Sequence, residues 1–553
     1  MEIKARSLAR PLTRYIIILC DTIPKSFRSR YNKPDDTLNS SFYIQITIAT
    51  RYMGNLRFLI APSQVPEDWS DLHRAYLNAV DGRVFPTRVE VDGNILTFRR
   101  QTSQSCKLNI VWNITDFGRP VVRTASLPER EEPYVLMLEL ARGKISTLKD
   151  QLSVWQIAGL NIPAELIRLH DEAFTAFAQA AVIQDQLEEC SELAGVALQK
   201  AHAAAEMLVQ IYARQRLTIL HQRSQSMKLP VSLGCNLGEF IPNASEGKQI
   251  CQAFDAANID LVNWKLIEKY EGEQDWDLCD QQVEWCEKNN LLIRGGCLLD
   301  FAPQGLPDWL ESWKIDMVNF QSIISHFIET AITRYTGSIR TWTLVSAMNT
   351  GGVFGLNEET RLTLTARAIE IARQTDDSIQ CYIRVEQPWG DYLSKGQHQL
   401  SPMQFVDAID RLGVGLSGID LELRIGYYPN GSHHHDLLDI SKLIDKWSVL
   451  NLPLHLTLAF PSDDSDLDEK NPSMSKVQAS QWKTGWSEAA QAEWVDLYLP
   501  LLLAKPSVTG VYWSRFRDQD ARRFPYSGLI NSQGQAKPAL NTIMKYHRQY
   551  WRT

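Results

Sequence analysis

From residue 230 onward, short apolar stretches alternate with longer amphipathic ones. Eight apolar stretches have the length of buried strands: residues 231–235, 259–264, 291–299, 341–347, 379–385, 419–425, 454–460 and 508–513. Stretches with helical periodicity, such as residues 361–373, separate them. Eight such units in residues 229–553 predict an α/β fold, a (β/α)8 TIM barrel. A doubly wound sheet is the alternative, but no glycine-rich phosphate loop follows any strand.

Residues 1–144 show a different pattern, in which apolar and polar residues alternate. Residues 42–48, 88–91, 95–98 and 107–114 alternate in this way. Between two of these stretches, Asp92-Gly93-Asn94 is a hairpin turn signal. Residues 15–20 are apolar but too short for an export signal, so we interpret them as a strand. Several short strands with turns between them predict a β-rich, sandwich-like domain.

Residues 145–228 have the periodicity of helices. Apolar residues recur at helical spacing, at positions 198, 201, 205, 208 and 211, and no proline interrupts residues 194–220. We interpret the region as a helical linker, an antiparallel helical pair between the β-rich domain and the barrel. A coiled-coil dimer is the alternative, although no heptad pattern is sustained.

Composition narrows the classes of partner. The chain has 553 residues and a net charge of −8, with both signs of charge scattered along it. No basic block is present, so we expect no nucleic acid partner. No apolar run is long enough to span a bilayer, so we expect no membrane partner. The nine cysteines include no CxxC pair, which favours free thiols and a cytoplasmic location. No metal or organic cofactor is implied, and the oligomeric state is not predicted.

Several segments of the barrel region carry motifs of one known family, in the same order along the chain. For example, Arg294-Gly295-Gly296-Cys297-Leu298-Leu299 is similar to RGHTLVWH, and Val508-Thr509-Gly510-Val511-Tyr512-Trp513 is similar to VTGITFWG. The other similar segments are residues 264–276, 306–309, 342–347, 454–458 and 528–539. In these segments the chain resembles family 10 of the glycoside hydrolases, the endo-1,4-beta-xylanase family. The resemblance implies a barrel enzyme that hydrolyses O-glycosyl bonds with retention and acts mainly on β-1,4-xylan.

The resemblance fails at the two residues that carry the chemistry. Retaining glycosidases use two carboxyl groups about 5–5.5 Å apart, one as acid and base and one as nucleophile. The resemblance places them after strands four and seven, where this chain has Ala347 and Leu458. No Asp or Glu lies between residues 339 and 357 or between residues 445 and 462, so a shifted alignment does not restore them. We therefore assign no catalytic residue.

Other polar and aromatic residues fall at or near the predicted carboxyl ends of strands, where barrels bind ligands. Some replace the sugar-binding residues of the family, and Trp264 and Trp513 remain at matching positions. The candidate substrate-binding residues are Trp264, Asp300, Glu386, Trp389, Glu422, Arg424 and Trp513. The carboxylates can form a salt-bridged network that fills a former active site, a new polar ligand site, or a relocated acid and base pair.

Three hypotheses for the function follow. The preferred one is a catalytically degenerate, family-10-like protein of carbohydrate metabolism that binds an oligosaccharide, a polysaccharide or a protein partner. The alternatives are an active O-glycosyl hydrolase with relocated carboxylates and a structural scaffold without a ligand. In such a protein the N-terminal β-rich domain is either a carbohydrate-binding module or a structural domain packed on the rest.

Overall fold

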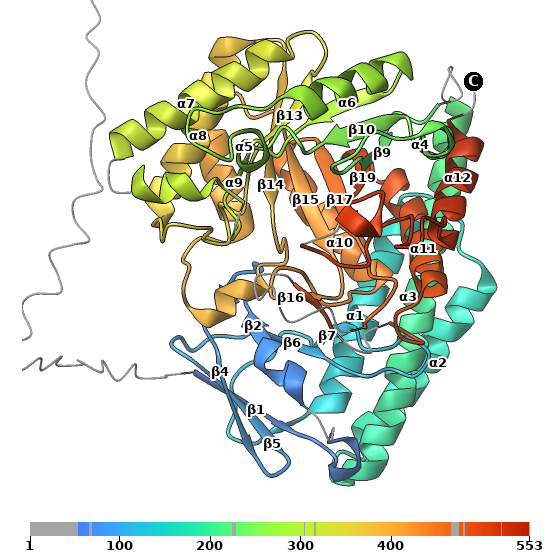
Figure 1. Ribbon diagram of the computed structural model, residues 1–553. Coiled ribbons are helices and arrows are strands. Elements are labelled where there is room, and N and C mark those ends of the chain that lie inside the picture. Colours follow the sequence, from blue (N-terminus) through green and yellow to red (C-terminus); the bar gives the residue numbers. More distant parts are fainter. Residues whose placement is uncertain are drawn as a thin grey trace, which may run out of the picture. The chain divides into compact units, whose positions relative to one another are not determined.

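Parallel strands and helices alternate from residue 232 to residue 550 of the computed structural model (Figure 1). The structure describes residues 54–65, 69–223, 228–303, 305–313, 317–465, 475–478, 482–520 and 523–551. The strands are β9 (Ser232–Asn236), β10 (Ala256–Ile259), β11 (Leu292–Gly295), β12 (Leu299–Asp300), β13 (Thr341–Ser346), β14 (Gln380–Val385), β15 (Gly418–Arg424), β17 (Leu454–Ala459) and β19 (Val508–Trp513). Both β11 and β12 pair with β13, so they occupy one strand position. β19 pairs with β9 and closes an eight-position barrel, as predicted.

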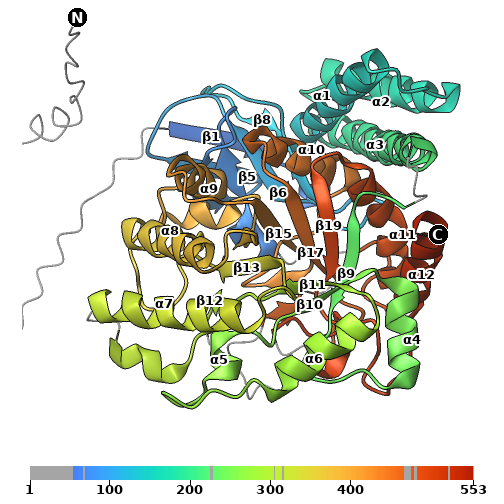
Figure 2. The same cartoon turned by 90° about the horizontal axis from the view of Figure 1, so that it is seen from above.

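Helices surround the closed sheet (Figure 2). They are α4 (Ala244–Ala253), α5 (Trp264–Ile267), α6 (Asp277–Lys288), α7 (Met317–Arg334), α8 (Glu358–Thr375), α9 (Pro402–Arg411), α10 (Leu437–Trp447), α11 (Glu488–Ala504) and α12 (Pro538–Tyr550). Side-chain caps fix several of the helix starts. Asn243 and Ser401 each form a capping box, and Asp436 accepts two backbone N–H bonds at the start of α10. Every residue of β15 and β17 is buried, as expected for parallel strands that are covered on both faces.

The second strand lies earlier in the chain than the sequence predicted. The pattern favoured residues 259–264, but β10 covers Ala256–Ile259 and its residues are small. The bulky residues that follow form a turn, and α5 begins at Trp264 because the Asn263 side chain caps it. The prediction relied on large apolar residues to locate strands, so it placed this strand too late in the chain.

Two four-stranded sheets make up the described N-terminal region. One contains β4 (Arg88–Asp92), β5 (Ile95–Arg100), β1 (Gly54–Leu59) and β8 (Tyr134–Val135), and the other β3 (Val84–Phe85), β2 (Tyr76–Asn78), β6 (Lys107–Val111) and β7 (Val121–Arg123). The predicted hairpin is confirmed, because Asp92 pairs with Ile95 and Gly93 has a φ of +58°. This region is β-rich, as expected. The strands predicted at residues 15–20 and 42–48 lie outside the described residues.

Three helices, α1 (Leu136–Ile157), α2 (Ala164–Val182) and α3 (Leu187–Arg223), follow the sheets where the pattern predicted a pair. The turn from α1 to α2 contains Gly159 in the left-handed region, and Pro163 precedes the first residue of α2. The first halves of α1 and α3 pack against the N-terminal sheets, and the second halves pack against the barrel. These two helices therefore join both cores. Among the described residues, no helix has the length and apolar character needed to cross a membrane.

The N-terminal sheets contact loops at the carboxyl ends of the barrel strands. Thr87 donates a backbone hydrogen bond to Ser394 after β14, and Val121 donates one to His434 after β15. Arg123 of β7 pairs with Asp439 at 2.9 Å. The short strands β16 (Tyr427–Tyr428) and β18 (Lys476–Val477) pair on the same side of the barrel (Figure 1). The β-rich region thus lies beside the end of the barrel where ligands bind in this fold.

Candidate functional site at the barrel mouth

Alternate residues of β15 point into the barrel and carry charge. Side chains two residues apart share one face of a strand, so Asp420, Glu422 and Arg424 line the interior in order from its middle to its mouth. All three are buried. A buried charge costs several kcal/mol unless it is paired and hydrogen-bonded, so the partners of these residues decide what the interior can do.

The deepest carboxylate, Asp420, has two arginine partners. Arg384 Nε donates to Asp420 Oδ2 at 2.8 Å, Arg294 Nη1 lies 3.3 Å from the same oxygen, and the Thr457 hydroxyl donates to Oδ1 at 2.8 Å. Burial raises the pKa of Asp420, but the two guanidinium groups outweigh burial and hold that pKa below its usual range. Asp420 is therefore a fixed anion.

The next carboxylate, Glu422, lies between two arginines. Arg424 donates to Glu422 Oε1, and Arg384 Nε lies 3.4 Å from the same oxygen. Burial raises the pKa of Glu422 to about 7 against the opposing effect of these arginines. The Arg424 guanidinium lies 3.9 Å from the ring centroid of Phe524, and burial lowers the pKa of Arg424 to about 10. Burial thus brings the protonation of Glu422 close to neutral pH.

At the mouth, one arginine bridges two carboxylates from different strands. Arg523, in the segment between β19 and α12, donates to Glu386 at 2.6 Å and to Asp300 at 3.3 Å. Ser346 donates to Asp300, and Thr350 donates to Glu386 at 3.3 Å. Burial raises the pKa of Asp300, but Arg523, Ser346 and a backbone N–H together lower it.

These groups form one connected set, which we call the charge network. Its members are Asp300, Glu386, Asp420, Glu422, Arg294, Arg384, Arg424 and Arg523. Four carboxylates therefore face four guanidinium groups, and the formal charges cancel. Breaking a buried pair by removal of one partner costs about 3–5 kcal/mol, so each member stabilises the others in place.

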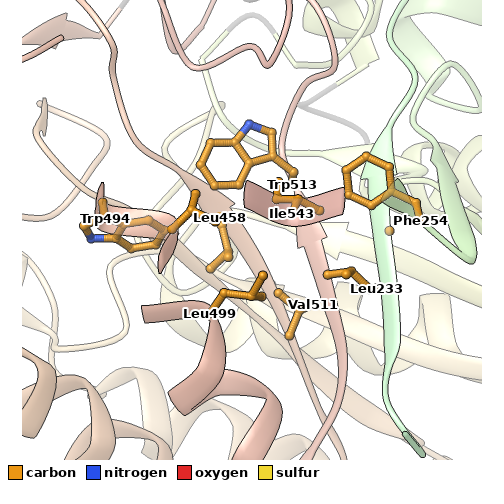
Figure 3. Close-up of a pocket in the computed structure, with 10 residues that line it drawn as sticks. Leu233, Phe254, Leu458, Trp494, Leu499, Val511, Trp513 and Ile543 are labelled. Carbon is orange, nitrogen blue, oxygen red and sulfur yellow. The ribbon is translucent and has the colours of Figure 1, made fainter. Parts of the chain in front are cut away.

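The two positions at which the resemblance places catalytic carboxyl groups are apolar and buried. Ala347 directly follows β13 and has a φ of +59°, a strained conformation for a residue with a Cβ. Leu458 does not face the mouth. It lies in a cavity of about 10 Å³ beside Trp494 and Trp513, between the sheet and helices α11 and α12 (Figure 3). Its inward neighbours are Thr457, which reaches Asp420, and Ala459, which packs with Tyr427 and Phe524.

The structure brings four of the seven predicted site residues into the charge network, namely Asp300, Glu386, Glu422 and Arg424. Trp264 is fully buried and stacks on Phe327, with ring centroids 5.0 Å apart. Trp513 faces outward, and its indole N–H donates to the Ser527 carbonyl at 2.7 Å. We therefore leave Trp264 and Trp513 out of the proposed site.

Trp389 lies in the loop after β14 and stacks on His435, with ring centroids 3.9 Å apart. His435 is one of three consecutive histidines, residues 433–435, that are buried where this loop meets the N-terminal sheets. Asp436 beside them is bound by Lys144 of α1 at 2.6 Å. One face of Trp389 is thus occupied by the chain itself.

Four members of the charge network, Arg294, Arg384, Asp420 and Arg523, are not among the seven predicted site residues. Asp420 had a signal, because it lies two residues before Glu422 on the same face of one strand. Arg294 had a similar signal, since it lies within a predicted strand and a buried arginine needs a carboxylate partner. Arg523 had none, because it lies in an irregular segment more than 100 residues from its carboxylate partners along the chain.

Comparisons with known proteins agree with the motifs. The sequence model of glycosyl hydrolase family 10 matches residues 243–420. Endo-1,4-beta-xylanase 2 of Arabidopsis thaliana is 20% identical over 298 residues, which are 52% of this chain and 24% of that protein. Endo-1,4-beta-xylanase 3 of Hypocrea jecorina is 27% identical over 126 residues, 22% of this chain and 35% of that protein. The chain thus spans about a quarter to a third of the length of these curated relatives.

Among solved structures, the xylanase TsXylA of Thermoanaerobacterium saccharolyticum, a mutant in complex with xylotetraose, is 19% identical to this chain. The match covers 57% of this chain and 95% of that chain, with a TM-score of 0.43. The family match and the similarity to the curated xylanases confirm the resemblance of the barrel to glycosyl hydrolase family 10 and its relation to carbohydrate-active proteins.

Proposed function

We propose that this chain is a catalytically degenerate, family-10-like protein of carbohydrate metabolism that recognises a saccharide and does not hydrolyse it. One observation carries the proposal: the positions expected to hold the acid and base and the nucleophile are Ala347 and Leu458. Neither side chain transfers a proton or attacks carbon. The outward orientation of Leu458 supports the same conclusion, because a carboxyl group there would not reach the mouth.

The charge network supports the loss of hydrolysis. A retaining glycosidase needs one protonated carboxyl group and one free carboxylate on opposite sides of the scissile bond. Asp300 and Glu386 are both held by Arg523, which occupies the space between them. The guanidinium keeps Asp300 ionised and blocks Glu386 as a nucleophile. The proposed role of this end of the barrel is therefore structural.

A second candidate function, hydrolysis by a relocated pair, is favoured by one observation. Burial raises the pKa of Glu422 to about 7, which is the property of a general acid. Arg424 and Arg384 oppose this role, because both guanidinium groups lie against Glu422 Oε1 and favour the ionised carboxylate. We therefore rank this function below saccharide recognition.

The test is hydrolysis of aryl β-glycosides and of xylo-, cello- and manno-oligosaccharides by the purified chain. We expect no turnover by the unaltered protein, by Glu386→Gln or by Glu422→Gln. Arg523→Ala is the sharper variant, because it frees both mouth carboxylates, and we expect it to be inactive too. Turnover by the unaltered protein that either glutamine substitution abolishes would overturn the proposal and establish a relocated pair.

Three further expectations from the sequence are part of the proposal. They are a cytoplasmic location, no nucleic acid or membrane partner, and a ligand that is an oligosaccharide or a polysaccharide. We also retain the division into a β-rich domain, a helical linker and a barrel as a proposal, to be tested by expression of residues 229–553 alone.

A further inference from the structure

A cleft of about 1050 Å³ lies where the three regions of the chain meet. We call it the junction cleft. One wall is the end of β6 with the residues that follow it, the second is the side of α3 around Gln199, and the third is residues 482–485 before α11. No member of the charge network lines it. Its volume is at the upper end of the range for small-molecule sites, which is enough for several sugar units.

The walls offer uncharged polar groups. Gln64, Asn113, Thr115 and Thr484 line this cleft, and their side chains have no hydrogen-bond partner within the described part of the chain. Amide and hydroxyl groups both donate and accept hydrogen bonds, so they match the hydroxyl groups of a sugar. Asn113 and Thr115 lie on the wall that follows β6, and Thr484 lies on the wall before α11, so polar groups from two regions of the chain line one cleft.

Aromatic rings supply the apolar part of the lining. Trp112 and Trp482 are buried and form part of the cleft lining, whereas Trp69 is partly exposed at its edge. A tryptophan ring presents a large flat surface at low entropic cost and packs against the C–H face of a sugar. An aromatic platform beside uncharged donors is the usual composition of a site that binds a neutral polar ligand.

The charges in the cleft lining are balanced locally. Arg119 pairs with Asp71 at 2.6 Å, and Lys483 pairs with Glu493 at 3.0 Å. The remaining charged group of the lining, Glu192, is exposed to solvent. No excess of either sign therefore selects a phosphate, a polyanion or a cation, and the ligand that fits is neutral.

We propose that the junction cleft is the saccharide-binding site of this chain and that it takes a neutral oligosaccharide. The proposal rests on the saccharide-recognition function proposed above and moves its site from the barrel mouth to the junction cleft. The N-terminal sheets then serve as one wall of a composite site that needs all three regions.

The experiment is isothermal titration calorimetry of the full chain with xylotetraose, cellotetraose and mannotetraose. The unaltered protein should bind at least one of them. Trp69→Ala should weaken binding about tenfold or more by removing the platform. The double variant Asn113→Ala/Thr484→Ala should also weaken it, and because both residues are exposed and unpaired, its fold should be unchanged. Glu386→Gln breaks a pair of the charge network at the mouth, so its fold is checked by circular dichroism, and the folded variant should keep the affinity of the unaltered protein.

The possible results separate the two proposals. If binding is lost in Glu386→Gln and kept in both cleft variants, the proposal of a site in the junction cleft is overturned, and saccharide recognition is placed at the mouth. Binding of none of the three tetrasaccharides by the unaltered protein would overturn both proposals. Hydrolysis of the bound tetrasaccharide would overturn only the proposed function. In that case, weaker binding by both cleft variants would still support a saccharide site in the junction cleft.

Discussion

The barrel mouth and the junction cleft both contain polar and aromatic side chains, but those side chains have different partners. At the mouth, every carboxylate of the charge network is bound by a guanidinium of the same chain. In the cleft, Asn113, Thr115 and Thr484 have no hydrogen-bond partner within the described residues. The two regions therefore differ in charge and exposure. The mouth groups are buried ions that hold one another, with Glu422 Oε2 left unbonded, whereas the cleft groups are neutral and open to solvent and to a ligand.

The contrast is also consistent with the proposed loss of hydrolysis. A barrel that lost its two catalytic carboxyl groups would retain a polar interior, and that interior must be neutralised because buried charges are costly. Arg523 provides this neutralisation for Asp300 and Glu386. The junction cleft lies at the protein surface, where polar groups need no such compensation.

The largest expected effect comes from returning a carboxylate to the strand-seven position. Leu458→Glu places a charge among Trp494, Trp513 and other apolar side chains with no partner nearby. We expect a loss of about 5 kcal/mol or more in the free energy of unfolding, measured by urea denaturation. Leu458→Met, of similar volume, should cost less than about 1.5 kcal/mol. A stable Leu458→Glu variant that hydrolyses an aryl xyloside would show that this position faces the mouth.

The next largest effect comes from breaking the charge network at its deepest point. Asp420→Asn keeps the shape of the side chain but leaves Arg294 and Arg384 without their shared carboxylate. We expect the free energy of unfolding to fall by about 3–5 kcal/mol. Asn113→Ala in the junction cleft is the matched control and should change it by no more than about 0.5 kcal/mol. Equal effects at the two sites would remove the distinction between them.

A smaller effect concerns acid stability. His455 stacks on Tyr382 and contacts the tilted ring of Tyr512 inside the barrel, and burial together with Arg294 lowers its pKa to about 3. Between pH 6.5 and about 3 the unfolded chain therefore binds a proton at this residue that the folded chain does not. Stability contributed by neutral His455 is present above pH 6.5 and is lost as the pH falls, by up to about 1.4 kcal/mol per pH unit.

His455→Phe keeps the stacking and removes the titration. Its free energy of unfolding should fall less steeply with decreasing pH than that of the unaltered protein, by up to about 1.4 kcal/mol per unit between pH 6 and 4. Urea denaturation at four pH values measures this slope. Parallel pH profiles for the two proteins would show that His455 is protonated in the folded chain.

Much of the fold could be predicted from the pattern of apolar residues. Seven of the eight predicted strands overlap the observed ones closely, since long runs of β-branched and large apolar residues mark buried parallel strands. The second strand was placed too late because its four residues, Ala256–Ile259, are mostly small. The third helix was missed although the sequence has a signal for it, since Gly159 and Pro163 mark a helix break between α1 and α2.

The candidate site was predicted less completely, for reasons of orientation and distance. Alternation along β15 identified Glu422 and Arg424, because side chains two apart share a face. The same rule does not say which face of a strand points into the barrel. The outward orientation of Leu458 and Trp513 was therefore not predicted. Arg523 is brought to Asp300 and Glu386 only by closure of the barrel, which no local pattern encodes.

The most direct measurement is proton NMR of the unaltered chain mixed in turn with xylotetraose, cellotetraose and mannotetraose, recorded over a day at pH 7. Each sample reports both binding, as saturation transferred from protein to sugar, and cleavage, as new reducing-end signals. Our account predicts saturation transfer that disappears in Trp69→Ala, with no new reducing ends. Reducing-end signals that grow with time and vanish in Glu386→Gln would contradict it.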